Sequence, residues 1–160
     1  MKIRKLTLPL AAVLCMAAAA AAAQPVATYA KDNAKFEDVR DDLKAAIESK
    51  GFVIDYQSHI GSMLERTGKD VGSTKALYAD AQTLQFCSAQ LSRKMMEADP
   101  ANVVMCPYTL VVYATAAQPQ RIVVAYRRPM RQGGTPASRA ALREVDVLLD
   151  GIAREAVGRK

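Results

Sequence analysis

The spacing of apolar residues along the chain predicts three helices. One apolar stripe, in which residues recur at intervals of three to four, consists of Phe36, Val39, Leu43 and Ile47. Gly51 follows this stripe and suits the left-handed backbone that often ends a helix. A second stripe follows Thr135-Pro136, a cap with proline at the first helical position, and consists of Leu142, Val145, Leu149 and Ile152. The third helix is Ser88–Glu97, because Pro100 disfavours helical geometry in the residue before it.

Runs of β-branched and aromatic residues predict strands between these helices. The runs are Val26–Tyr29, Phe52–Tyr56, Thr83–Cys87, Val103–Tyr113 and Arg121–Tyr126. The last two are expected to form a hairpin that turns at Gln118-Pro119-Gln120. Pro107, near the start of this hairpin, indicates a bulge or an edge position. Ser58–Thr74 is expected to hold only one or two helical turns, because three glycines interrupt it.

Helices that alternate with strands, together with an antiparallel hairpin, indicate an α+β fold. We expect a single two-layer sandwich, with a mixed or antiparallel sheet and the helices packed on one face. A doubly wound nucleotide-binding fold is not expected, since no glycine-rich phosphate loop follows a strand. Gly133-Gly134-Thr135 precedes a helix but lacks the flanking pattern of such a loop.

The first 23 residues have the pattern of a removable export signal. Three positive charges in Met1–Lys5 precede an apolar stretch, Leu6–Met16, and an alanine run that ends at Ala23. Cleavage before Gln24 would leave about 137 residues: an N-terminal segment at 24–34 with the first strand, and one domain at 35–157. We therefore expect an exported protein, periplasmic or secreted, with no transmembrane segment after the signal is removed.

Removal of the signal also changes the charge of the chain. The net charge falls from +6 to +3, because three basic residues leave with the signal. The remaining excess of positive charge lies after Gln120, where the chain has nine basic and four acidic residues. Arg127, Arg128 and Arg131 could bind a phosphate, a lipid headgroup or an acidic partner, or could form a solvated surface. Nucleic acid is not expected as a partner of an exported protein. A small ligand, a protein partner and a second copy of the chain remain open.

Two of the three cysteines remain after Cys15 leaves with the signal, in a compartment that permits disulfides. Cys87 is expected where a strand meets a helix N-terminus, and there the helix dipole would lower the pKa of its thiol. Cys87 and Cys106 could form a structural disulfide or remain inert thiols. They could also act as a redox pair, or bind a metal or a haem-type group.

Support for a metal site or a catalytic site is weaker. The soft donors near the two thiols in sequence are Met95, Met96 and Met105, to which the single histidine, His59, can be added. No spacing matches a closed zinc site and no Cys-x-x-Cys motif occurs, so no cofactor is implied. With one histidine and no nucleophile-elbow sequence, hydrolytic catalysis is not expected, and a binding protein is favoured over an enzyme.

Several phrases of the sequence, taken together, resemble a known family. They are Lys50-Gly51-Phe52, His59-Ile60-Gly61 with Met63-Leu64, Phe86-Cys87-Ser88-Ala89 before a helix that ends in Glu97-Ala98-Asp99-Pro100, and Cys106-Pro107-Tyr108 before Val111-Val112-Tyr113. Their order and spacing resemble the domain of unknown function 302 family over residues 36–129, with the last helix in the same unit. The resemblance implies a small α+β domain, often bacterial and sometimes exported, with no established activity to transfer. Many relatives have Leu-Pro-Cys where this chain has Cys106-Pro107-Tyr108, which moves the thiol to the other side of the proline.

The expected function is binding without catalysis. We expect a small ligand or a partner protein to occupy a pocket between the sheet and its helices, near Cys87, Cys106 and Tyr108. Tyr113 and Tyr126 lie in the same hairpin and could line this pocket with Tyr108, or could pack in the core with one edge in solvent. The alternative is a periplasmic thiol-redox protein or a soft-metal protein, for copper or a haem-type group, that uses Cys87 and Cys106.

Overall fold

The computed structural model describes residues 25–131 and 133–159. The predicted export signal, its predicted cleavage site and Cys15 lie outside these residues. The described chain forms five strands, which are β1 (Val26–Lys31), β2 (Ile54–His59), β3 (Tyr78–Phe86), β4 (Tyr108–Thr115) and β5 (Gln118–Arg127). Its α-helices are α1 (Phe36–Glu48), α2 (Ile60–Thr67), α3 (Ala89–Ala98) and α4 (Pro136–Ala156). Two short 3₁₀ helices accompany them, η1 (Lys69–Val71) and η2 (Pro100–Met105).

The strands form one antiparallel sheet in the order β1-β5-β4-β3-β2. β1 pairs with β5 from end to end, with Val26 opposite Arg127 and Lys31 opposite Ile122. The first and last strands of the chain therefore lie side by side at one edge, and β4 occupies the middle of the sheet.

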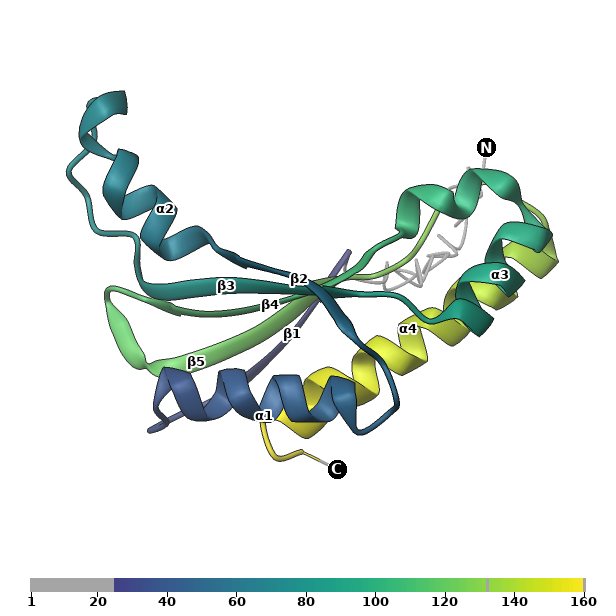
Figure 1. The fold of residues 1–160 in the computed structure, drawn as a ribbon, viewed down its shortest axis with the longest axis horizontal. Helices are drawn as coiled ribbons and strands as arrows, with labels where there is room; N and C mark the ends of the chain where they lie inside the picture. The colour runs from purple at the N-terminus through teal and green to yellow at the C-terminus, as the bar shows by residue number, and fades with distance from the viewer. Residues whose placement is uncertain (1–24, 132, 160) are drawn as a thin grey trace, which may run out of the picture.

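Helices α1 and α4 cover one face of this sheet (Figure 1). Along β4 the buried residues alternate with half-buried ones, as expected for a strand with one face against a core. The buried set is Tyr108, Leu110, Val112 and Ala114. The apolar stripes predicted for the first and last helices pack against this set, and α3 packs against α4 at one end of the sheet. The α+β fold class is confirmed.

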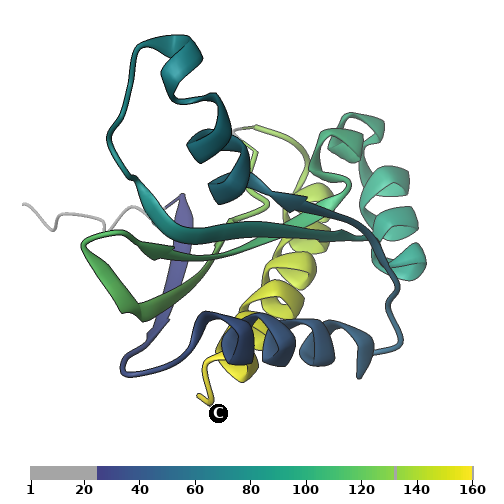
Figure 2. The same cartoon turned by 60° about the vertical axis from the view of Figure 1, so that its left-hand side comes forward.

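α2 extends from the end of β2 and packs against β3 (Figure 2). The contact is close at Gly61, where a Cβ atom would lie 2.7 Å from the backbone nitrogen of Ala81. A side chain at this position would collide with strand backbone, so the approach of α2 requires glycine. No residue of α2 is buried, and this helix therefore adds little to the core.

Two predicted strands have different boundaries. β3 begins at Tyr78 rather than at Thr83, because pairing with β4 outweighs the low strand propensity of Ala79-Asp80-Ala81. β2 begins at Ile54 rather than at Phe52 and continues to His59. Phe52 instead stacks on Phe86, with ring centroids 5.4 Å apart.

The hairpin differs from its prediction at both ends. Val103 and Val104 were expected in a strand, but they belong to η2, which Pro100 begins and the Asp99 side chain caps. Pro107 lies neither at a bulge nor at a sheet edge, because it precedes β4, an interior strand. The turn lies at residues 116–117, since residues 118–120 already belong to β5. Among the described residues, no helix is both long enough and apolar enough to span a membrane.

Candidate functional site

A cleft of about 540 Å³ opens where β4 begins and β5 ends. η2 contributes Val104 and Met105 to its walls, and the last residue of β5 and the segment after it contribute Arg127–Met130. The sheet contributes Thr109 and Val111, which point away from α1 and α4 because they alternate with the buried residues of β4. The rest of the lining consists of Thr83, Pro107, Tyr108 and Leu149.

Most side chains of this cleft are apolar, and several are open to solvent. Val104 is 71% exposed and Met130 is 49% exposed. Polar groups come from the two threonines, Tyr108 and the two arginines. Apolar walls with a few polar groups are typical of a site for a small ligand.

The three arginines that the sequence singles out have different surroundings. Arg128 donates to Asp146 Oδ2 at 2.6 Å, and Arg131 donates to Asp99 Oδ2 at 2.9 Å. Arg127 is exposed and makes no ion pair within the described part of the chain. Arg128 and Arg131 are therefore neutralised, and Arg127 is the arginine of the three that can receive an anion at the cleft.

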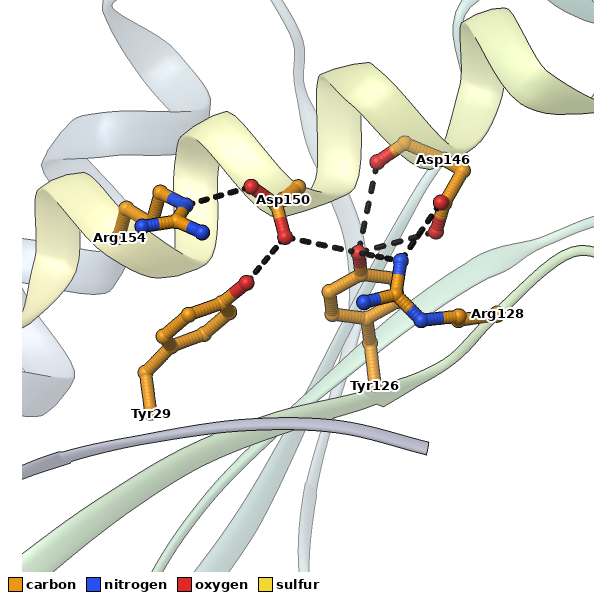
Figure 3. A network of polar contacts seen from close by, with 6 residues as sticks. All are labelled: Tyr29, Tyr126, Arg128, Asp146, Asp150 and Arg154. Atoms are coloured by element: carbon orange, nitrogen blue, oxygen red, sulfur yellow. Dashed lines mark hydrogen bonds and ion pairs between the residues drawn. The ribbon is translucent and has the colours of Figure 1, made fainter. Parts of the chain in front are cut away.

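A polar network between β5 and α4 fixes the position of Arg128 (Figure 3). Tyr126 is 2% exposed and its Oη donates to Asp146 Oδ1 at 3.0 Å. Arg128 contacts both partners, because its guanidinium also lies 5.9 Å from the centroid of the Tyr126 ring. The arginine is thus held at the wall of the cleft by Asp146 and Tyr126.

The same network continues to β1 through Asp150, one helical turn after Asp146 (Figure 3). Asp150 accepts hydrogen bonds from Tyr29 Oη and from Arg154 Nε, the latter at 2.6 Å. Arg154 lies over the Tyr29 ring, 4.9 Å from its centroid. The network therefore connects the edge strand, α4 and the arginine at the cleft.

The electrostatics of the network favour a charged Asp150 and neutral tyrosines. Burial raises the pKa of Tyr126, and its hydrogen bond to the Asp146 carboxylate raises it further. Burial and Asp150 raise the pKa of Tyr29 in the same way. Burial alone would raise the pKa of Asp150, but the hydrogen bonds from Tyr29 and Arg154 outweigh it and lower the pKa. Both tyrosines therefore keep their hydroxyl protons near neutral pH and donate hydrogen bonds to the aspartates.

Cys87 and Cys106 lie at the same end of the sheet as the cleft. Cys87 follows β3 and is exposed, Cys106 precedes Pro107 and β4 and is half-buried, and both thiols are free. Phe86 is opposite Tyr108 in the β3–β4 pairing. Cys87, which follows Phe86, therefore lies close to Cys106, which comes two residues before Tyr108. The structure thus places Cys87, Cys106 and Tyr108 near one another, without a disulfide.

Ser92 of α3 contacts two members of this group, Cys106 and Tyr108. Its Oγ lies 3.3 Å from Cys106 Sγ and 3.2 Å from Tyr108 Oη. Burial raises the pKa of Tyr108 to about 12, although the hydrogen bond with Ser92 acts in the opposite direction. Tyr108 is therefore neutral and can donate a hydrogen bond at physiological pH.

The expected lowering of the Cys87 pKa is wrong. The N-cap of α3 is Ser88, and its hydroxyl accepts from Leu91 N at 3.3 Å, so Cys87 lies one residue outside the helix. Protein atoms around the thiol partly desolvate it and raise its pKa, and the neighbouring Cys106 and Asp55 raise it further. At neutral pH a smaller fraction of Cys87 is consequently present as thiolate than for a free cysteine.

The other soft donors do not join the thiols. His59 is exposed and lies at the far end of β2, where it pairs with Gln82. Ile54, at the near end of β2, pairs with Phe86, the residue before Cys87. Five residues of strand separate His59 from Ile54, which corresponds to roughly 16 Å. Met95 is fully buried, and Met96 and Met105 pack against the same core. In the described ranges, no group of three or more His, Cys, Asp or Glu residues could hold a metal ion.

Asn102 is a fully buried polar residue of η2 behind the cleft. Its Nδ2 donates to the Met95 carbonyl at 2.8 Å and to Ser138 Oγ at 2.9 Å. Its Oδ1 accepts from Arg131 at 3.2 Å. These bonds tie η2 to α3 and α4, and so fix the wall of the cleft that Val104 and Met105 form.

The sequence profile of one protein family matches residues 27–156 of the chain. The chain belongs to the family described as domain of unknown function DUF302. Among solved structures, an uncharacterized conserved protein DUF302 from Bacillus stearothermophilus is similar, with a TM-score of 0.68 and 15% sequence identity. The alignment covers 84% of this chain and 99% of that chain, and it shows that the two share the DUF302 fold. No curated protein matches the chain significantly.

Several polar residues of this DUF302 domain were not found from the sequence. They are Tyr29, Asn102, Asp146, Asp150 and Arg154. Three of them recur every four residues on α4 beside its apolar stripe, and that spacing is a signal that could have pointed to a polar row facing the sheet. Asn102 carries no such signal, because its burial depends on how η2 packs against α4.

Proposed function

We propose that this DUF302 chain is an exported, non-enzymatic binding domain, and that a small ligand with an apolar body and one anionic group occupies the cleft between η2, β4 and the segment after β5. The observation that carries the proposal is the combination of apolar walls with Arg127, whose charge no acidic residue of the described chain neutralises. An exposed guanidinium at the rim of an apolar cleft suits a carboxylate, a sulfonate or a phosphate.

The dimensions of the cleft support a small ligand rather than a protein partner. Its volume of about 540 Å³ lies within the usual range for ligand sites, roughly 300–1,000 Å³. Arg128 and Tyr108 at its wall are held by Asp146 and Ser92, so these polar groups are in place before a ligand arrives. Little ordering of side chains would therefore oppose binding.

The second candidate is a thiol-redox or soft-metal protein that uses Cys87 and Cys106. The proximity of two free thiols, one exposed and one half-buried, favours it. The raised pKa of Cys87 argues against fast thiol chemistry at neutral pH. A copper site would have to rely on two sulfurs, since the described residues offer no third His, Cys, Asp or Glu ligand beside them.

The proposal can be tested with two fluorescent probes that share one aromatic body. 8-Anilinonaphthalene-1-sulfonate carries an anionic sulfonate, and N-phenyl-1-naphthylamine is its uncharged counterpart. The variant Arg127→Gln should weaken binding of the sulfonate about fivefold, which corresponds to about 1 kcal/mol, and should leave binding of the neutral probe unchanged. Arg66→Gln, an exposed arginine on α2, is the matched control and should change neither affinity.

A third variant locates the apolar part of the site. Val111→Trp places a large side chain in the cleft from the half-buried face of β4 and should weaken binding of both probes. Circular dichroism and thermal melting of each variant establish that the fold is retained. Equal sulfonate affinity of Arg127→Gln and the wild type, or insensitivity of both probes to Val111→Trp, would refute the proposed site.

A further inference from the structure

The thiol pair and the cleft share one short segment of chain. Met105, Pro107 and Tyr108 line the cleft, and Cys106 lies between them in sequence. The Cys106 thiol contacts Ser92 of α3 instead of lining the cleft, and its backbone N–H donates to the Val103 carbonyl at 3.0 Å. The backbone of Cys106 is therefore tied to η2, and a displacement of this backbone would also move η2 and the first residue of β4.

The two thiols are placed for successive roles in disulfide exchange. Cys87 is exposed and can meet an incoming disulfide, whereas Cys106 is half-buried beside it. Neither sulfur forms a disulfide, and within the described chain neither belongs to a group of three or more His, Cys, Asp or Glu residues that could hold a metal ion. The pair is thus free to react, and the exposed member would react first.

We propose that Cys87 and Cys106 form a reversible disulfide whose formation weakens ligand binding in the cleft. The effect on binding rests on the proposed function. The oxidant is a low-molecular-weight or protein disulfide. The Cys87 thiolate attacks one of its sulfurs and releases one thiol, and the Cys106 thiolate then attacks the Cys87 sulfur and releases the second. Two protein thiols are oxidised to one disulfide, and one external disulfide is reduced to two thiols.

Formation of the Cys87–Cys106 disulfide requires a movement of Cys106 that changes the shape of the cleft. The two sulfurs must approach to about 2.05 Å, so Cys106 Sγ must leave its position beside Ser92 and move toward the β3–α3 junction. Met105 and Pro107, the neighbours of Cys106 on either side, both line the cleft, so a shift of this segment toward the β3–α3 junction changes the position of that wall. Ser92 also contacts Tyr108 Oη, so the oxidation disturbs a polar group of the lining as well.

The test measures the affinity for 8-anilinonaphthalene-1-sulfonate in both redox states. All proteins carry Cys15→Ser, which leaves Cys87 and Cys106 as the only cysteines of the chain. Incubation with glutathione disulfide should give an internal disulfide, seen in the intact mass as the loss of two hydrogen atoms, and reductant should reverse it. The oxidised protein should bind the probe about fivefold more weakly than the reduced protein.

Two variants assign the roles. Cys106→Ser should accumulate a glutathione adduct on Cys87, because no resolving thiol follows. Cys87→Ser cannot form the internal bond, and its affinity for the probe should not respond to the oxidant. Persistence of two free thiols in the parent protein, or a response of Cys87→Ser as large as that of the parent, would overturn the inference.

The failure of this inference differs from the failure of the proposed function. If the reduced protein binds the probe and Val111→Trp weakens binding, but the oxidised protein binds equally well or more tightly, only the redox coupling is refuted. If Val111→Trp leaves binding to the reduced protein unchanged, the cleft is not the probe site and both proposals are refuted.

Discussion

The hydrogen bond from Tyr29 to Asp150 can be tested by removing one oxygen atom with Tyr29→Phe. The ring stays buried, since Tyr29 is only 9% exposed, so the substitution removes the hydroxyl and leaves the packing intact. A hydrogen bond to a charged group contributes about 1.5–3 kcal/mol. The Asp150 side chain is 26% exposed and keeps Arg154 as a partner, so water can replace the lost donor. We therefore expect the lower value, a loss of about 1.5 kcal/mol, or roughly 4–6 °C in Tm.

The effect of Tyr29→Phe should depend on pH in a defined direction. The folded-state pKa of Asp150 is lower than its ordinary value of 3.8, so its contribution to stability is present above that value and is lost as the pH falls through the lowered pKa. The difference between wild type and variant should consequently narrow at about pH 3. At the alkaline end, the raised pKa of Tyr29 contributes stability that is fully present below 10.0 and is lost as the pH rises through the raised pKa.

Urea unfolding followed by far-ultraviolet circular dichroism, at pH 7 and at about pH 3, measures this difference. Tyr56→Phe is the matched control, because Tyr56 is 59% exposed on the other edge strand, and it should leave stability unchanged. A Tyr29→Phe variant as stable as the control at pH 7 would refute the stabilising bond. A destabilisation of equal size at both pH values would refute the assignment to the charged form of Asp150.

Two further outcomes are expected. Asn102→Ala removes three hydrogen bonds from a fully buried site and should lower the free energy of unfolding by about 2–3 kcal/mol. The control Gln90→Ala, on the exposed face of α3, should change this free energy little. Equal stabilities of the two variants in urea unfolding would contradict the expectation. In reduced protein, iodoacetamide should alkylate Cys87 more slowly than free glutathione at pH 7, with a rate that rises about tenfold per pH unit toward its raised pKa, and peptide mass spectrometry would expose a faster reaction.

The elements that the sequence predicts well are those whose pattern is set by burial alone. The stripe from Phe36 to Ile47 and the one from Leu142 to Ile152 became α1 and α4, because each has one face against the sheet. The predictions failed where a residue's own propensity opposed its context. Val103 and Val104 favour strands, yet Asp99-Pro100 starts a 3₁₀ helix that leaves both valines exposed.

The proximity of Cys87, Cys106 and Tyr108 could be predicted from the sequence, but the electrostatics of the cleft could not. The cysteines and Tyr108 lie at strand ends that the order of elements brings to one end of the sheet. Whether the charge of Arg128 is available to a ligand depends on its ion pair with Asp146, which lies 18 residues away on a helix whose rotation the sequence does not specify. For the same reason, the pattern after Gln120 indicated a basic surface, whereas ion pairs leave Arg127 as the available member of the three arginines.

The pairing of β1 with β5 has a consequence for how the chain reaches its fold. About 100 residues separate the paired positions, so the sheet cannot be completed until nearly the whole domain is present. Until β1 arrives, β5 has an unpaired edge whose residues Ile122–Tyr126 are otherwise buried, and such an edge can add a strand from another molecule. β1 thus protects the edge of β5 from pairing with other molecules, and a chain that lacked β1 would be prone to aggregation.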